Sequence, residues 1–548
     1  MNSATDKTGK ESLPWILLGI LVAVSGGLLL SLTAGIHFIS DEWNLLFLRP
    51  GWSPNSFLEP FHEHIIIAPA FIYKMLQGTF GMESNRPFQI AAILTFLTLA
   101  PLLFIWMRRR VGEWAALIGV AVILFLGAAF EDLLWAFQIG YFGSLACGVG
   151  ALLALDRDDR QGDLAAAVLL VLGLSFSSLG VPFIVGAGVE WLVNPRERRR
   201  RWLIPASGLI FYALWWLGWG HDAESAVSLS NLPEAPRYVF DAASAAVTSS
   251  LGLATGDGSE PDQPHLIWGR IGLVVLLGLA AWRLWRMKKV PPGVLVTGAI
   301  ALAFFGLAAL GQNELRPPTS SRYQLPAVLM LLLFFTEILR GVRLAPPALA
   351  AAGMVVLVTS LLGVDLMKEQ AETRWRPASD WTRTYLGTVA YAGAEARPDL
   401  VLDLGPGSAV PVHRFLDEIE ASGTPGLTGD QLEGADAGLR AQADQILVDA
   451  TGPLLSGEKP ASGFGGCVTH AANATATVDG SADTVEVRSL GSQDLAIGLN
   501  RFGDPPGISV GSVIAGSKAW LLLPRIDSPP DWKLTGDGRF AVCYRRSG

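Results

Sequence analysis

The sequence predicts a polytopic α-helical membrane protein that carries a water-soluble C-terminal domain. Of its 548 residues, 51% are hydrophobic and only 16% are charged, and the mean hydropathy is +0.39. These values are more apolar than those of typical soluble proteins. The apolar residues are concentrated before about Val364, and the remaining sequence is rich in Gly, Pro, Asp and Ser. We therefore expect a membrane domain over residues 1–364 and a soluble domain over residues 365–548.

Apolar stretches of about 20 residues, enough to cross a bilayer, recur along the first part. The stretch Leu164–Val193 is longer and breaks at Ser177-Ser178, and basic residues flank both of its ends. Because basic flanks favour the cytoplasm, it predicts two short helices that go out and return. With these two, about eleven crossings are predicted, the others being Leu13–Gly35, Phe88–Met107, Trp114–Phe130, Ile139–Leu155, Trp202–Gly220, Ile271–Trp285, Val294–Leu310, Gln324–Leu339 and Pro346–Leu362.

The basic residues Lys7, Lys10 and Arg108 to Arg110 favour the cytoplasmic side. With an odd number of crossings, this rule places the N-terminus in the cytoplasm and the soluble domain outside the cell membrane. Cys467 and Cys543 both lie in that domain, and a disulfide between them suits an oxidising compartment. Two unpaired thiols in a cytosolic tail are the alternative. The first outer loop includes an apolar piece, Ile65–Tyr73, which we expect along the membrane interface. A later outer loop predicts a helix around Ala235–Ser250.

The soluble domain divides into two parts. Residues 365–460 predict mixed α/β structure, in which Leu400–Leu404 and Gln445–Asp449 have the pattern of strands and Val412–Ile419 that of a helix. Residues 461–548 contain alternating apolar runs separated by Gly and Pro turns. This pattern predicts a small β-sandwich.

An acidic pair, Asp41-Glu42, follows the first predicted span and precedes Trp43. Tryptophan favours the headgroup zone of a bilayer, so this pair is expected at the height of a lipid phosphate. A carboxylate at that place can act as a general base. Ordinary solvated residues at a helix end are the alternative interpretation.

Further polar residues gather in the predicted outer segments. Arginine binds phosphate through a fork of N–H donors, and Arg322 stands at the outward end of a helix; its alternative role is to reach the membrane interface. His62 and His64 could ligate zinc, but no third and fourth ligands follow at a recognisable spacing, so no metal is assigned. The residues are His62, Glu63 and His64 in the first loop, Glu131 and Asp132 after the third span, and Arg316, Arg322 and Tyr323 in a later loop.

Charge and missing motifs exclude two classes of protein. The net charge of -8 leaves no basic face for a nucleic-acid partner once the loop arginines are assigned to membrane orientation. The sequence also contains no Walker-type glycine loop and no Cys-x-x-Cys. These absences argue against an ATP-driven pump.

With these features the chain resembles the GT-C superfamily of integral-membrane glycosyltransferases, which use polyprenyl-phosphate-linked sugars. The resemblance rests on Asp41-Glu42-Trp43, on His62-Glu63-His64 before an interfacial helix, on the break at Ser177-Ser178 and on Ser321-Arg322-Tyr323. It also includes the number of spans and the soluble outer domain. It implies a multi-pass protein of a bacterial-type plasma membrane.

The resemblance implies a role for each group. Asp41 would deprotonate an acceptor hydroxyl that attacks the sugar with inversion, while Glu42 would shape the field or hold the acceptor. Arg322, with Arg316 or His64, would neutralise the departing lipid phosphate. The acceptor would be a glycan, lipid or protein. The resemblance also allows a Mg²⁺ or Mn²⁺ ion, for which the sequence identifies no ligands. The residues implied in acceptor or substrate binding are His62, Glu63, Glu131, Asp132 and Tyr323.

Three other functions stay open from the residues. A lipid or polysaccharide transporter would place ionisable residues along a midplane pathway, whereas here they gather at the ends of spans. A glycan ligase or polymerase shares the chemistry but usually has more outer-loop arginines. A non-catalytic glycan-binding protein would tolerate the loss of Asp41.

Overall fold

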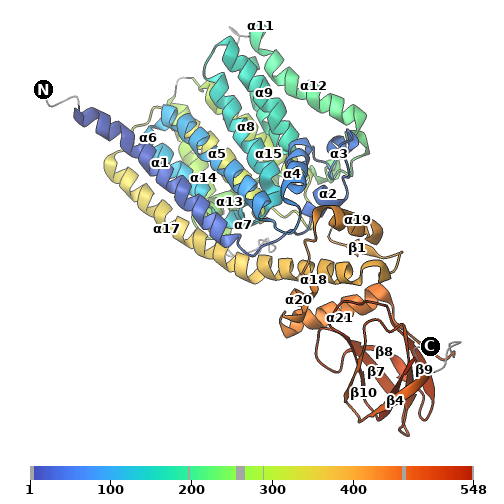
Figure 1. The fold of residues 1–548 in the computed structure, drawn as a ribbon. Coiled ribbons are helices and arrows are strands. Elements are labelled where there is room, and N and C mark those ends of the chain that lie inside the picture. Colours follow the sequence, from blue (N-terminus) through green and yellow to red (C-terminus); the bar gives the residue numbers. More distant parts are fainter. Residues whose placement is uncertain are drawn as a thin grey trace. The chain divides into compact units, whose positions relative to one another are not determined.

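The computed structural model describes residues 5–194, 198–254, 266–287, 289–405, 407–458 and 464–545. The chain divides into two compact units, and Figure 1 labels many of their elements. The helical unit contains Met1–Gly35, Arg49–Met75 and Arg86–Trp375, and the C-terminal unit contains Ile36–Leu48, Leu76–Asn85 and Arg376–Gly548. Two segments of the first predicted outer loop therefore belong to the C-terminal unit.

The helical unit is built from α-helices joined by short 3-10 turns. Its last helix continues into a π-helical turn, Ala371–Trp375, so the predicted boundary at residues 364/365 falls inside a helix. The α-helices are α1 (Thr5–Leu32), α3 (Asn55–Leu58), α4 (Ile67–Phe80, which ends in the C-terminal unit), α5 (Arg86–Val111), α6 (Glu113–Leu124), α7 (Phe130–Leu134), α8 (Ile139–Leu155), α9 (Arg160–Phe176), α10 (Val181–Val193), α11 (Arg198–Arg201), α12 (Leu203–Gly218), α13 (Ala235–Ser250), α14 (Leu266–Arg286), α15 (Pro292–Leu310), α16 (Gln324–Ile338) and α17 (Pro346–Gln370).

Every predicted apolar stretch contains a helix, but the number of crossings is not confirmed. In the described part of the chain, 6 helices are long and apolar enough to cross a membrane, or up to 7 if the bent pair Glu113–Leu124 and Gly127–Leu134 is one span. Other predicted spans are short: α9 has 17 residues and α16 has 15. The break at Ser177 is confirmed, because α9 ends at Phe176 and α10 begins at Val181.

Glycines allow the closest helix crossing near the polar residues discussed below. A Cβ at Gly127 would collide with the backbone of Gly363 on α17. The two backbones therefore touch at this crossing, as small residues permit in membrane helix packing. This crossing precedes α7, the short helix that carries Glu131 and Asp132.

The C-terminal unit combines helices with antiparallel sheets. The helices are α2 (Glu42–Phe47), α18 (Arg376–Ala392), α19 (Val412–Ser422), α20 (Gly429–Glu433) and α21 (Ala437–Thr451). A hairpin pairs β1 (Val401–Asp403) with β2 (Ala409–Pro411). One sheet has the order β5 (Thr475–Val478), β10 (Trp532–Gly536), β7 (Leu495–Asn500), β8 (Ile508–Val513), and the other the order β3 (Leu454–Ser456), β9 (Lys518–Leu522), β6 (Thr484–Ser489), β11 (Phe540–Arg545), β4 (Phe464–His470).

The two larger sheets match the β-sandwich predicted for residues 461–548, although β3 begins earlier, at Leu454. Side chains such as Val485, Trp532 and Phe540 are fully buried and form the core of these sheets. Cys467 and Cys543 lie opposite each other in neighbouring strands. A disulfide of 2.12 Å joins them.

The prediction of a strand over Gln445–Asp449 is wrong, because these residues lie within α21. The Asp436 side chain caps the helix by accepting from the Leu439 amide at 2.9 Å, and Gly452 ends it in the left-handed conformation. Ala443 and Leu447 are buried one helical turn apart. The short apolar run that suggested a strand is the buried face of a capped helix.

Candidate active site

A tight turn presents Glu63 and His64 in the helical unit. The backbone groups of Phe61 and His64 pair with each other, at 3.1 and 2.9 Å, and His62 between them has a φ of 49°. Phe61 and Ile65, on either side of the turn, are buried. The apolar anchors therefore fix the turn, while the side chains of His62, Glu63 and His64 each keep some exposed surface.

Glu63 forms an ion pair with Arg316, 253 residues later in the sequence. Both side chains are largely buried, with exposed fractions of 15% and 18%. The Tyr238 hydroxyl on α13 donates to the backbone oxygen of Arg316 at 3.2 Å, and Nε2 of His64 lies 3.8 Å from Oε1 of Glu63. Arg316 is thus held by contacts to both its guanidinium group and its backbone oxygen.

A second cluster surrounds Glu131 on α7. Its Oε1 lies 3.2 Å from the Arg374 guanidinium, and its Oε2 lies 3.7 Å from Nε of Arg322. The same Oε2 accepts from the Arg322 backbone amide at 3.2 Å. Ser321 completes the link, because its hydroxyl accepts from the Glu131 amide and donates to the Ala128 oxygen. Glu131 therefore fixes the short turn Ser321–Tyr323 on which Arg322 stands.

Asp132 is completely buried beside this cluster. Its carboxylate is within electrostatic reach of Arg322, Glu131 and Tyr141. Neither oxygen has a hydrogen-bond partner of standard geometry among the described residues, although the Leu325 amide lies close enough to stabilise the charge. Tyr141 and Tyr323 bring phenolic hydroxyls to the same region.

Electrostatics set the charge of the two clusters at neutral pH. Burial would raise the pKa of Glu63, but the hydrogen bond and charge of Arg316 hold that pKa below its usual range. Burial lowers the pKa of His64, and the charges of Arg316 and Arg322 lower it further against the opposing effect of Glu63. Glu63 is therefore ionised and His64 neutral. Arg316, Arg322 and Arg374 face Glu63, Glu131 and Asp132, so three guanidinium groups are gathered beside three carboxylates.

The Asp41 motif lies in the C-terminal unit, within the segment Ile36–Leu48. The Glu42 side chain is completely buried, and its Oε2 accepts from the Ile39 amide at 3.0 Å. It closes the turn that starts α2, as the glutamate of a capping box does. Ser40 before it has a φ of 51°, and its hydroxyl lies 3.2 Å from Oδ1 of the partly exposed Asp41. Glu42 thus shapes the loop, and Asp41 is presented by it.

The sequence identified the residue types but not the partners. The structure brings together seven of the predicted residues in the helical unit: Glu63, His64, Glu131, Asp132, Arg316, Arg322 and Tyr323. His62 lies at their margin, and Asp41 and Glu42 lie in the other unit. Sequence reasoning missed Arg374, Tyr141 and Tyr238. The sequence position of Arg374 could have identified it, because Arg374 follows a long apolar helix just as Arg322 precedes an apolar helix.

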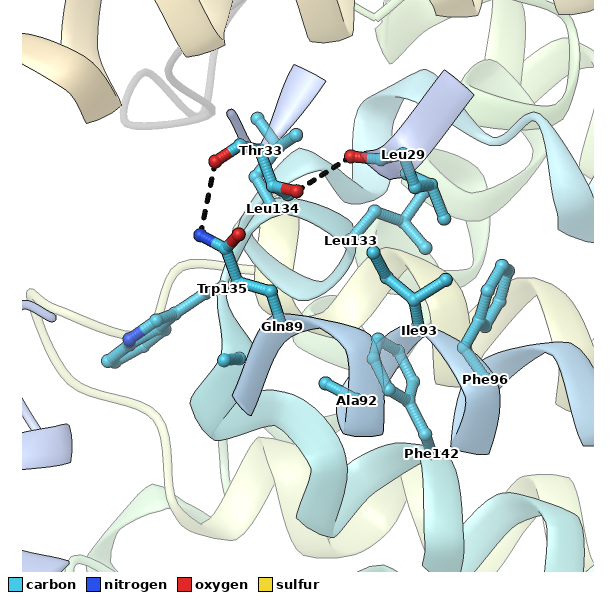
Figure 2. A pocket seen from close by; sticks show the side chains of 11 residues that line it. Leu29, Thr33, Gln89, Ala92, Ile93, Phe96, Leu133, Leu134, Trp135 and Phe142 are labelled. Carbon is cyan, nitrogen blue, oxygen red and sulfur yellow. Dashed lines mark hydrogen bonds between the residues drawn. The ribbon is translucent and has the colours of Figure 1, made fainter. Parts of the chain in front are cut away.

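Neither the pocket near these elements nor the described side chains accommodate a substrate or a metal. The pocket of Figure 2 lies between α1, α5 and the segment Leu133–Phe142, and apolar side chains line most of it around the hydrogen bond from Gln89 to Thr33. It has room for about one water molecule. Among the described residues, no group of three or more His, Cys, Asp or Glu side chains could hold a metal ion. The described residues therefore offer no ligand set for a divalent cation.

Several apolar helices of spanning length and a compact cluster of arginines and carboxylates define a multi-pass membrane protein with a polar, anion-compatible site. No protein-family model matches the chain, and no curated protein sequence matches it. A structure search found ArnT from Cupriavidus metallidurans bound to undecaprenyl phosphate, with a TM-score of 0.44 and 13% sequence identity. The match covers 74% of this chain and 84% of that one. A likeness at this level assigns neither substrate nor site.

Proposed function

We propose that the protein is an inverting membrane glycosyltransferase that moves a sugar from a polyprenyl-phosphate donor to an extracytoplasmic glycan, lipid or protein acceptor. The observation that carries the proposal is the gathering of three guanidinium groups around Glu63 and Glu131. Arginine forks suit the oxygens of a phosphate. A phosphate carried on a lipid is the form of this ligand that a multi-pass membrane protein is suited to meet.

The proposed reaction is one displacement at the anomeric carbon. Asp41 takes the proton of an acceptor hydroxyl, and that oxygen forms the new bond to carbon. The bond between the anomeric carbon and the phosphate oxygen breaks, and the phosphate leaves with the electron pair. Arg316 and Arg322 stabilise the charge that grows on the leaving oxygen. No step of this scheme uses a metal ion.

The donor part of the proposal is tested by removing each guanidinium separately. Arg316→Gln and Arg322→Gln are expected to weaken binding of a labelled polyprenyl-phosphate sugar by about tenfold to a hundredfold, the range for a lost charge-assisted hydrogen bond. The assay uses the full-length protein in lipid nanodiscs and reports donor binding and transfer. Arg237→Gln serves as the matched control, because that side chain is 80% exposed and pairs loosely with Asp241.

Normal donor binding in both variants would make the two arginines structural and remove the proposed phosphate site. Weak binding in Arg237→Gln as well would indicate a general effect of surface charge. A selective loss at Arg316 and Arg322 supports the site. It leaves the role of Asp41 to a separate experiment, because Asp41 acts on the acceptor hydroxyl.

A further inference from the structure

The segment that carries Asp41 is anchored within the C-terminal unit at several points. The His37 amide donates to the hydroxyl of Ser379, a buried residue on α18, at 2.8 Å. Gly405 packs against Ser40, since a Cβ there would lie in van der Waals contact with the Ser40 hydroxyl, at 3.4 Å. The Phe47 ring packs edge-on against the buried Phe415 on α19, with 5.5 Å between ring centroids. These contacts bracket the motif on both sides.

A second segment of the same unit, Leu76–Asn85, reinforces this anchoring. The Gln77 side chain donates to the Leu46 backbone oxygen at 3.5 Å and to Oε1 of Glu418 at 2.8 Å. Gln77 therefore links α2 to α19. The Met82 amide donates to the Ser422 oxygen at 2.8 Å, which ties the far end of this segment to the end of α19.

Backbone strain marks the position beside the motif. Ser40 has a φ of 51° without being glycine, a conformation that persists only where the surroundings impose it. Its surroundings include Gly405, which has a φ of +118° and whose Cβ position lies within 4 Å of Ser40. The strained residue directly precedes Asp41 and contacts its carboxylate. The direction of the Asp41 side chain thus depends on the residues that hold Ser40.

We propose that the C-terminal unit positions the proposed general base, with Ser379 and Gly405 as positioning residues for Asp41. This inference rests on the proposed function. A general base must lie within hydrogen-bond reach of the proton that it takes, and an error of about 1 Å can reduce the rate about a hundredfold. The C-terminal unit therefore contributes to the transfer step itself and is more than an appended glycan-binding module.

The hydrogen bond to Ser379 gives the first test. In the full-length protein, Ser379→Ala should increase hydrogen–deuterium exchange in the peptide covering Ile36–Leu48 and lower kcat about tenfold, because the His37 amide loses its acceptor. The KM for the donor should change less than about twofold, since donor binding is assigned to other residues. Ser379→Thr keeps a hydroxyl and should restore both values. Thr382→Ala is the matched control, because its hydroxyl bonds within its own helix to Ala378.

The close approach at Gly405 gives the second test. Gly405→Val should push Ser40 away and lower kcat by about tenfold to a hundredfold without loss of donor binding. Gly516→Val is the matched control, since Gly516 also has a positive φ, +65°, but meets nothing within 4 Å. Gly516→Val reports the cost of a branched residue at a positive φ in open space, and the exchange over Ile36–Leu48 reports whether Ser40 itself is displaced.

Unchanged exchange over Ile36–Leu48 in Ser379→Ala and Gly405→Val would overturn the inference. Increased exchange with normal kcat, in a protein that Asp41→Asn inactivates, would overturn it as well. If Asp41→Asn itself has no effect on transfer, the proposed function fails instead. The exchange measurement separates these results because it does not depend on activity.

Discussion

His37 connects a single titration to the stability of the Asp41 loop. Burial, together with the charge of Arg383, lowers the pKa of His37 from 6.5 to about 4. The unfolded chain therefore binds this proton first as the pH falls. The stability that neutral His37 contributes is complete above pH 6.5 and is lost as the pH falls toward 4.

We predict that His37→Gln makes the unfolding temperature less sensitive to acid. Between pH 6.5 and 4.5, the wild type should lose more stability than the variant, because only the wild type has to keep a buried imidazole neutral. Thermal unfolding of both proteins across this range measures the difference. Parallel curves would show that His37 titrates normally in the folded protein.

The polar residues of the site could be predicted individually, but their pairing could not. Carboxylates, histidines and arginines stand out in the sequence because the stretches around them are apolar. The pairing of Glu63 with Arg316 joins positions 253 residues apart. Only the packing of the helices determines that contact, and one sequence carries no record of it. The hydrogen bond from the Ile39 amide to the buried Glu42 likewise has no counterpart in the sequence pattern.

Elements with strong local signals were predicted well. The helix Ala235–Ser250 was predicted within its observed limits, and Val412–Ile419 lies within α19. Segment Gln445–Asp449 was assigned to a strand because a short apolar run has no decisive period. The capping residues of α21, Asp436 and Gly452, lie outside this run, and they are the signals that indicate a helix.

The disulfide at the sheet edge makes a prediction for strands β4 and β11. β4 is the edge strand of its sheet, and the disulfide closes a segment with a sequence separation of 76. Replacing both cysteines by serine should lower the free energy of unfolding of the C-terminal unit by about 4 kcal/mol in the chain-entropy model. Native-state hydrogen exchange of β6 and β9 amides measures it. A reductant should destabilise the wild type and leave the double variant unchanged.

The composition of the chain predicts its fold class but not its division into two units. Residues Ile36–Leu48 adjoin the first span in sequence but belong to the C-terminal unit. Their apolar side chains, such as Trp43 and Phe47, pack in that unit's core. Such long-range association depends on complementary surfaces that a linear pattern does not reveal.

The predicted orientation is tested by labelling from outside the cell. A cysteine at the exposed Asp430 should react with a membrane-impermeant thiol reagent, and a cysteine at the exposed Gln161 should not, because the adjacent arginines favour the cytoplasm. Labelling after permeabilisation verifies that both thiols are reactive. The reverse pattern would invert the topology and place the Asp41 loop on the cytoplasmic side.

The transfer rate of Asp41→Asn tests the proposed role of Asp41 as general base most directly. Asparagine keeps the size of the side chain and cannot accept the proton. The rate of transfer from a polyprenyl-phosphate sugar should therefore fall by about two to four orders of magnitude, while donor binding stays normal. Asp41→Glu, which retains a carboxylate, should keep more activity than Asp41→Asn. Transfer by Asp41→Asn at the wild-type rate would contradict the role of Asp41 and the mechanism built on it.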